Sequence, residues 1–151
     1  MSINYVEKKE KIILAVMVFV FDEEKNILLL KRIDNGQWEP IKGGINVGEN
    51  WKSAALRELN EESSIVPKNN PELLRVIDDE LDTAQGKKTK IKGYVAYCYV
   101  AGVKPNINIH QEEDGELEHD EYKWVSLEEI ESEKIWPPVA NNLVKEIEKK
   151  L

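Results

Sequence analysis

Three glutamates are crowded on one predicted helix: Glu58, Glu61 and Glu62. Residues three and four positions apart are neighbours on one face of a helix, so these carboxylates repel one another. They also fall in the last two turns, where the helix dipole favours cations. Each effect destabilises the helix by only about half a kcal/mol at an exposed site, but both are unfavourable as long as no cation is bound to the acidic face. A bound divalent cation reverses the sign of both.

The type of ligand selects the type of cation. Carboxylate oxygens without a neighbouring histidine or cysteine favour Mg²⁺, Mn²⁺ or Ca²⁺ over Zn²⁺. Mg²⁺ is commonly held by one or two carboxylates together with phosphate oxygens of a substrate. The triplet therefore points to chemistry on phosphates. A solvated acidic face is the alternative reading of the triplet alone, because the chain has 29 acidic residues.

The triplet belongs to a longer pattern of fixed spacing. Gly43 is followed six positions later by Glu49, and Arg57-Glu58 and Glu61-Glu62 complete the pattern. With average residue usage, six such positions match by chance in about one chain in 10⁵. The pattern resembles the Nudix box. Ser64 departs from it, since the family has glycine there, and a left-handed serine costs about 1 kcal/mol.

This resemblance implies a Mg²⁺-dependent Nudix hydrolase, with Mn²⁺ as a substitute, that cleaves a phosphoanhydride bond in a nucleotide derivative. A dinucleoside polyphosphate or a nucleoside triphosphate leads the substrate list, with nucleotide sugars and 5′-triphosphate RNA as alternatives. An inactive nucleotide-binding regulator on the same fold is one rival, although its usual mark is a missing box glutamate. An acidic interaction module without a ligand is the other.

The resemblance also implies roles for individual residues. Glu58, Glu61 and Glu62 would be metal ligands, together with the backbone carbonyl of Lys42. Glu58 or Glu61 would serve as the base that activates water, and the family pattern leaves this choice open. Arg57 would orient the carboxylates and count among the catalytic residues.

The segment before the box carries the substrate prediction. Residues 38–43 resemble the Trp-x-Pro-x-Lys-Gly stretch of asymmetric dinucleoside tetraphosphate hydrolases. The resemblance implies that Trp38 and Lys42 contact substrate. Gly43 and Gly44 would let the backbone approach substrate and metal closely. Glu49 would brace this glycine-rich loop.

One more acid is expected from a loop near the C-terminal end of the chain. Glu118-His119, followed by Tyr122 and Trp124, resembles the same segment of dinucleoside polyphosphate hydrolases, so Glu118 is the predicted catalytic acid. The alternatives in this loop are Glu112, Glu113 and Glu116. His119 by itself is expected to be exposed. A basic cluster is formed by Lys87, Lys88 and Lys90, for which a solvated turn is favoured over contact with phosphate.

Length and charge bound the class of protein. The chain of 151 residues fits a single domain over residues 1–151. Its net charge of -8 disfavours long nucleic acid and anionic membranes, but a small phosphorylated substrate can still bind if cations screen it. The resemblance implies that this partner is a small nucleotide. The apolar run Ile12 to Phe21 is half of what a bilayer crossing needs. With a single cysteine, these features predict a cytoplasmic location. A monomer or a homodimer is expected, and the sequence leaves this choice open.

The box must be positioned by the elements around it. Residues 12–21 and 27–32 read as strands of a hairpin, and residues 38–48 as a shaped loop with at most a short strand. Asn50 is the predicted N-cap of a helix that ends near Ser63.

The second half of the chain predicts further strands and a terminal helix. Strands are expected at 73–81, 90–101 and 122–125, with a turn at 85–87 and an exposed loop at 106–121. An apolar stripe begins after two prolines and comprises Val139, Leu143, Val144, Ile147 and Leu151. The order of elements predicts an α/β (α+β) fold, and the resemblance implies a Nudix-like α/β/α sandwich with a central mixed sheet.

Overall fold

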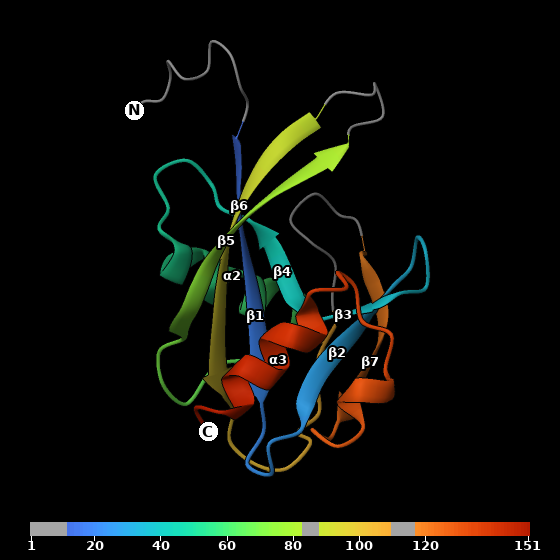
Figure 1. The fold of residues 1–151 in the computed structure, drawn as a ribbon. Coiled ribbons are helices and arrows are strands. Elements are labelled where there is room, and N and C mark those ends of the chain that lie inside the picture. Colours follow the sequence, from blue (N-terminus) through green and yellow to red (C-terminus); the bar gives the residue numbers. More distant parts are fainter. Residues whose placement is uncertain (1–11, 83–87, 110–116) are drawn as a thin grey trace.

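A computed structural model describes residues 12–82, 88–109 and 117–151 (Figure 1). In these ranges the elements are β1 (Ile12–Phe21), β2 (Ile27–Arg32), β3 (Trp38–Glu39), β4 (Ile41–Gly44), α2 (Trp51–Ser63), β5 (Glu72–Asp82), β6 (Lys88–Tyr99), β7 (His119–Val125), the 3-10 helix η1 (Ile130–Ser132) and α3 (Ala140–Glu148). The strands form one mixed sheet. None of the helices in the described part is long and apolar enough to cross a membrane.

Strand β1 is the centre of the sheet. It pairs in parallel with β6 along its whole length and antiparallel with β4 on its other side. It meets β2 only where Phe21 lies opposite Ile27. Strand β2 then pairs with both β3 and β7, so this branch of the sheet diverges from the end of β1 (Figure 1).

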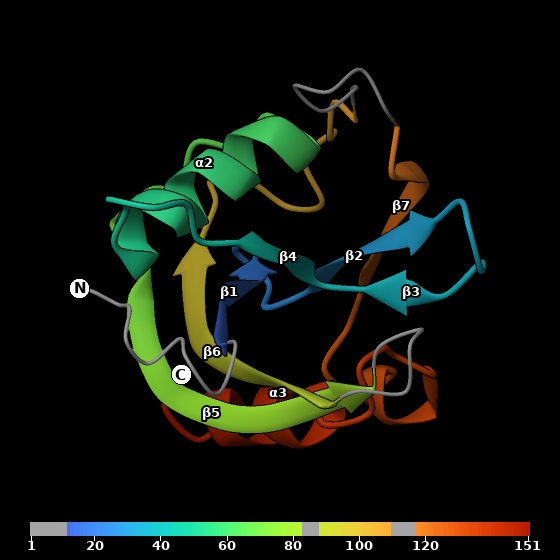
Figure 2. The same ribbon diagram turned by 90° about the horizontal axis from the view of Figure 1, so that it is seen from above.

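Both faces of β1 are buried from Val18 to Phe21, which explains the continuous apolar sequence there, whereas Ile12 to Leu14 at the start of the strand are exposed. Phe19 and Phe21 belong to the core that includes α3, whereas Val18 and Val20 belong to the core that includes α2. The alternation is that of a strand between two layers. Figure 2 shows the two helices on opposite sides of the strands. The predicted α/β/α sandwich with a mixed sheet is confirmed.

Helix α2 begins and ends as the sequence predicts. The side chain of Asn50 accepts a hydrogen bond from the backbone N–H of Ser53 at 2.8 Å. At the other end Ser64 has φ of 60°, and its N–H donates to the carbonyl of Asn60 at 3.0 Å. The buried face toward the sheet includes Leu59. The helix is therefore capped at both ends, and its last turns are held against the sheet.

Three details differ from the sequence prediction. Residues 38–48 contain two short strands, β3 and β4, separated by Pro40, which has no N–H to donate to a ladder. Strand β7 begins at His119 rather than at residue 122, because His119 pairs with Arg32. Val139 precedes α3 and is 39% exposed, so its predicted place in the buried stripe is wrong. The predicted turn at 85–87 lies outside the described residues.

Candidate active site

Arg57 is the centre of a network that joins helix α2 to the loop before it. Its Nη1 donates to Glu58 at 2.7 Å and to Glu61 at 2.8 Å. Its Nε and Nη2 donate to the two carboxylate oxygens of Glu49, each at 2.9 Å. Nη2 also donates to the carbonyl oxygen of Gly44 at 2.7 Å. These hydrogen bonds lower the pKa of Glu49 to about 2, so this acid stays ionised and holds the loop.

Glu58 lies directly against the backbone of β4. A Cβ atom placed on Gly43 would be 2.1 Å from Oε2 of Glu58, so any side chain at position 43 would displace this carboxylate. The pKa of Glu58 is raised to about 7, mainly by burial; Arg57 opposes the rise, and the charges of Glu61 and Glu118 contribute to it. A glutamate with a pKa near neutrality can accept or release a proton under ordinary conditions.

Glu62 is also buried, at 3% exposed, one helical turn after Glu58. The sequence thus correctly predicted a crowded set of carboxylates. Arg57, which was expected to orient these carboxylates, contacts Glu58 and Glu61 and offsets part of their repulsion. Within 12–82, 88–109 and 117–151, no three His, Cys, Asp or Glu side chains are grouped so that they alone would hold a metal ion.

Glu118 approaches this cluster from another part of the chain. Its charge is among those that raise the pKa of Glu58. Its carbonyl oxygen accepts a hydrogen bond from the N–H of Ile33 at 3.0 Å, which places it beside the end of β2. The alternative acids Glu112, Glu113 and Glu116 lie outside the described residues. The catalytic role of Glu118 stays a prediction.

Trp38 lines a cavity of about 700 Å³, and Lys42 lies next to this cavity through its contact with Trp136. Trp38 and Trp136 both line this cavity. The ammonium of Lys42 lies 4.5 Å from the centroid of the Trp136 ring, and that of Lys123 lies 4.3 Å from the Trp38 ring. Sequence reasoning missed Trp136, since the Trp-Pro-Pro segment was interpreted only as a break before the last helix.

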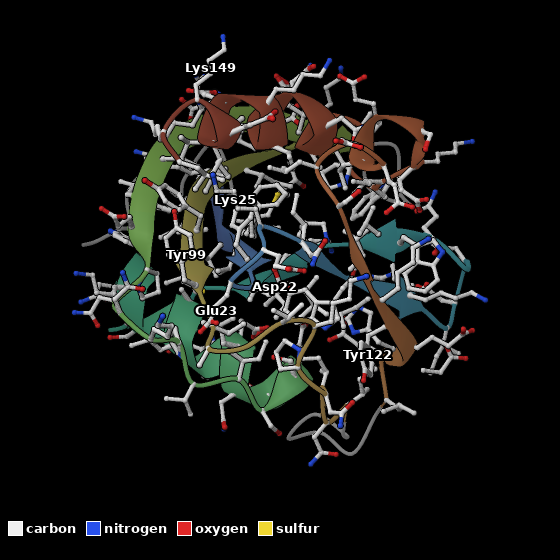
Figure 3. The ribbon with its side chains drawn as sticks, turned by 90° about the horizontal axis from the view of Figure 1, so that it is seen from below. Asp22, Glu23, Lys25, Tyr99, Tyr122 and Lys149 are labelled. Atoms are coloured by element: carbon white, nitrogen blue, oxygen red, sulfur yellow. The ribbon has the colours of Figure 1, made fainter. Side chains whose placement is uncertain are left out.

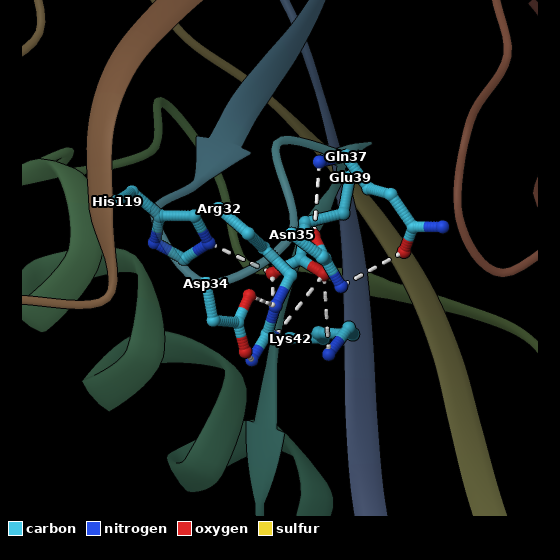
Figure 4. Close-up of polar contacts among 7 residues, drawn as sticks. All are labelled: Arg32, Asp34, Asn35, Gln37, Glu39, Lys42 and His119. Atoms are coloured by element: carbon cyan, nitrogen blue, oxygen red, sulfur yellow. Dashed lines mark hydrogen bonds and ion pairs between the residues drawn. The ribbon is translucent and has the colours of Figure 1, made fainter.

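A buried polar group lies beside the cluster of glutamates. Nε2 of His119 is 2.7 Å from Oε2 of Glu39, and the two side chains are only 2% and 1% exposed (Figure 4). Nη1 of Arg32 lies 3.4 Å from the same carboxylate, and Nζ of Lys42 lies 3.3 Å from it. The prediction that His119 is exposed is therefore wrong. Pairing of β7 with β2 buries it.

The predicted basic cluster takes a different position. Lys87 lies outside the described residues, whereas Lys88 and Lys90 begin β6. The strand register places Lys90 opposite Glu80 of β5. Lys88 and Lys90 thus lie in a strand rather than in a turn, and the choice between a solvated cluster and a phosphate contact stays a prediction.

Comparison with known proteins agrees with this architecture. The model of the NUDIX domain matches residues 11–146. An RNA pyrophosphohydrolase of Pelagibacter ubique is 30% identical over 125 residues, which are 77% of this chain and 77% of that protein. A dihydroneopterin triphosphate diphosphatase of Escherichia coli is 24% identical over 127 residues, which are 78% of this chain and 79% of that protein.

A solved structure shows the same fold. The crystal structure of a MutT protein from Methanosarcina mazei superposes with a TM-score of 0.73 at 25% sequence identity, covering 94% of this chain and 96% of that one. The region matched by the NUDIX model contains the whole box from Gly43 to Ile65, all of α2 and most of α3. The chain belongs to the NUDIX domain family and is a hydrolase of phosphoanhydride bonds.

Proposed function

We propose that this hydrolase cleaves a pyrophosphate bond of a nucleoside triphosphate or a dinucleoside polyphosphate, with Mg²⁺ bound beside helix α2. The observation that carries the proposal is the pair of buried carboxylates, Glu58 and Glu62, with Glu58 held against the backbone of Gly43. Two buried carboxylates one turn apart are costly without a cation, because burial favours the neutral form.

The residues fit a hard divalent cation. Glu58, Glu61 and Glu62 and the carbonyl of Lys42 would supply only oxygen atoms, which suits Mg²⁺ and also Mn²⁺. Two or fewer of the carboxylates, completed by the phosphates of the substrate, are enough for Mg²⁺. When bound, the ion would withdraw negative charge from phosphate oxygens and acidify water.

The protein side chains would then guide a water molecule to phosphorus. The water oxygen forms a bond to phosphorus, its proton passes to the carboxylate of Glu58 or Glu61, and the bond to the leaving phosphate oxygen breaks. In the metal-free protein the pKa of Glu58 is about 7, and a bound cation would lower it, which would favour the ionised carboxylate that accepts a proton. Arg57 would keep both candidate bases in place, since its Nη1 contacts each of them.

The aromatic cavity is the proposed binding site for the nucleobase of the substrate, whose phosphates would lie at the glutamates of α2. Trp38 and Trp136 line it, and flat aromatic rings stack well on bases. Asn141 also lines it, and among the described residues nothing donates a hydrogen bond to its buried Oδ1 atom. A base that carries an N–H or amino group would satisfy this acceptor.

A screen of phosphate release tests the substrate class. Wild-type protein is assayed with and without Mg²⁺ on nucleoside triphosphates, dinucleoside polyphosphates, nucleotide sugars, 5′-triphosphate RNA and dihydroneopterin triphosphate. The last two are named for the relatives from P. ubique and E. coli. We expect Mg²⁺-dependent turnover to be fastest on one of the first two classes. Faster turnover of triphosphorylated RNA would replace the substrate proposed here.

The glutamate variant Glu62→Gln tests the metal site. We expect turnover to fall by at least about 100-fold, because the amide is a poor ligand for the cation that activates the reaction. The isosteric change should not lower the melting temperature in EDTA, because it removes a buried charge. A rate within about twofold of wild type would count against this site.

A further inference from the structure

We propose that the buried Glu39–His119 pair, with Arg32 and Lys42 against it, is a positioning device that fixes Glu118 on one side and Lys42 on the other. The inference rests on the proposed function, in which these two flanking residues act on substrate. Glu39 and His119 themselves touch no reacting atom.

The pair is buried and made from distant parts of the chain. Glu39 belongs to β3 and His119 to β7, 80 positions later, and their side chains are 1% and 2% exposed. A buried carboxylate is costly unless several donors surround it. Here Arg32 and Lys42 complete the set, as the dashed lines in Figure 4 show. The arrangement links four strands, β2, β3, β4 and β7.

One end of the device leads to Glu118. This acid is the residue directly before His119, and its carbonyl oxygen is held by the N–H of Ile33. With the next side chain anchored on Glu39, the backbone that carries Glu118 has little freedom to move. Its carboxylate stays close enough to Glu58 for its charge to act there.

The other end leads to Lys42. Oε1 of Glu39 lies 3.3 Å from Nζ of Lys42, and this ammonium lies 4.5 Å from the centroid of the Trp136 ring. Trp136 lines the aromatic cavity, and Lys42 is followed in the chain by Gly43, against which Glu58 packs. The buried carboxylate of Glu39 thus aligns the ammonium group of Lys42, a residue that contacts Trp136 of the cavity on one side and precedes Gly43, against which Glu58 packs, on the other.

A double-mutant cycle separates positioning from simple stabilisation. His119→Phe removes the donor to Glu39, and we expect kcat to fall about 10-fold with little change in KM, as for other supporting partners of a site. In a Glu118→Gln background, His119→Phe should lower kcat by less than about twofold, because the carboxylate through which it acts is already lost. His119→Gln, which keeps a donor, should recover most of the activity.

A second cycle tests the other end. Glu39→Gln should raise KM about 10-fold in wild type, because Lys42 is no longer aligned, and should raise it much less in a Lys42→Met background. Arg75→Gln is the matched control, since it removes an exposed ion pair of 2.8 Å to Glu146. This control should change neither parameter.

A readout that does not depend on activity completes the test. The chain has two histidines, and a ring N–H donated to a buried carboxylate exchanges slowly with water. We expect one slowly exchanging imidazole N–H signal in the proton NMR spectrum, which disappears in His119→Phe and shifts in Glu39→Gln.

The outcomes separate the two claims. If wild type hydrolyses its substrate but the losses in both cycles are additive, the positioning role is wrong and the proposed function stands. If wild type hydrolyses none of the nucleotides screened, the proposed function is wrong and the positioning role falls with it.

Discussion

Glu58 ionises in surroundings that oppose its charge. Burial is the main cause that raises its pKa from the usual value of 4.5 to about 7. A folded-state pKa above the unfolded value means that the native state binds the proton more tightly. The stabilising contribution of the neutral carboxyl is complete below pH 4.5 and is lost as pH rises through about 7. In alkaline solution the free energy of unfolding is therefore about 3 kcal/mol lower, as far as Glu58 contributes, than it is below pH 4.5.

Glu58→Gln should therefore stabilise the metal-free protein in a pH-dependent way. In EDTA at pH 8.5 we expect its melting temperature to exceed that of wild type by several degrees, because the buried charge is gone. At pH 4 the two should melt together. Thermal unfolding followed by circular dichroism measures both.

The control for this prediction is Glu131→Gln, since Glu131 has an exposed side chain. It should show no such dependence on pH. Added Mg²⁺ should raise the melting temperature of wild type at pH 8.5 and raise that of Glu58→Gln less, as expected when a ligand binds only the folded state. An equal rise in the two proteins would exclude Glu58 as a ligand.

Gly43 is required by space rather than by backbone conformation. Its added Cβ would be 2.1 Å from the carboxylate of Glu58, whereas a Cβ on Gly44 would be 4.0 Å from its nearest neighbour, the carbonyl oxygen of Leu14. We expect Gly43→Ala to lose at least about 10-fold in kcat, because Glu58 must move. Gly44→Ala is the matched control for folding, and its free energy of unfolding in urea should equal that of wild type.

At the scale of elements, the end of helix α2 carries a cost that glycine would remove. Ser64 adopts φ of 60° and contributes one 3.4 Å hydrogen bond from its Oγ to the carbonyl oxygen of Asn108. Ser64→Gly should stabilise the protein by about 0.5 to 1 kcal/mol in urea unfolding, because a left-handed serine is strained. Ser64→Ala keeps the strain without the hydroxyl, so it should not stabilise.

At the scale of the whole molecule, Asp22 joins segments that are far apart in sequence. Its carboxylate accepts hydrogen bonds from the N–H groups of Glu24, Asn26 and Lys104 and from the side chain of Asn26. It thereby ties the turn between β1 and β2 to the loop after β6. Figure 3 shows Asp22 next to Glu23 at this end of the sandwich.

Asp22→Asn should destabilise the protein at neutral pH and much less in acid. Burial by itself raises the pKa of Asp22, but the hydrogen bonds from Asn26 and the backbone outweigh it and the net pKa is lowered. The stabilisation is therefore present above pH 3.8 and is lost as pH falls through the lower folded-state pKa. We expect a loss of about 2 kcal/mol in urea at pH 7. An equal loss at pH 2.5 would contradict this account.

Local pattern was enough to predict most elements of this protein. The bounds of β1, β2 and α2 agree with the predicted ones, because apolar alternation, a turn signal and an N-cap are encoded by neighbouring residues. The two strands on either side of Pro40 were missed, since strands of two and four residues are too short to show a period.

By itself the sequence determined the family, the glutamate helix and the layers of the fold, because fixed spacing and periodicity are properties of short stretches. The tertiary structure alone decided that His119 is buried on Glu39, that Trp136 lies beside Lys42, and that Arg57 reaches the carbonyl oxygen of Gly44 in β4. These contacts join residues up to 94 positions apart, as from Lys42 to Trp136. The pairing of whole strands sets them, and no local pattern carries that information.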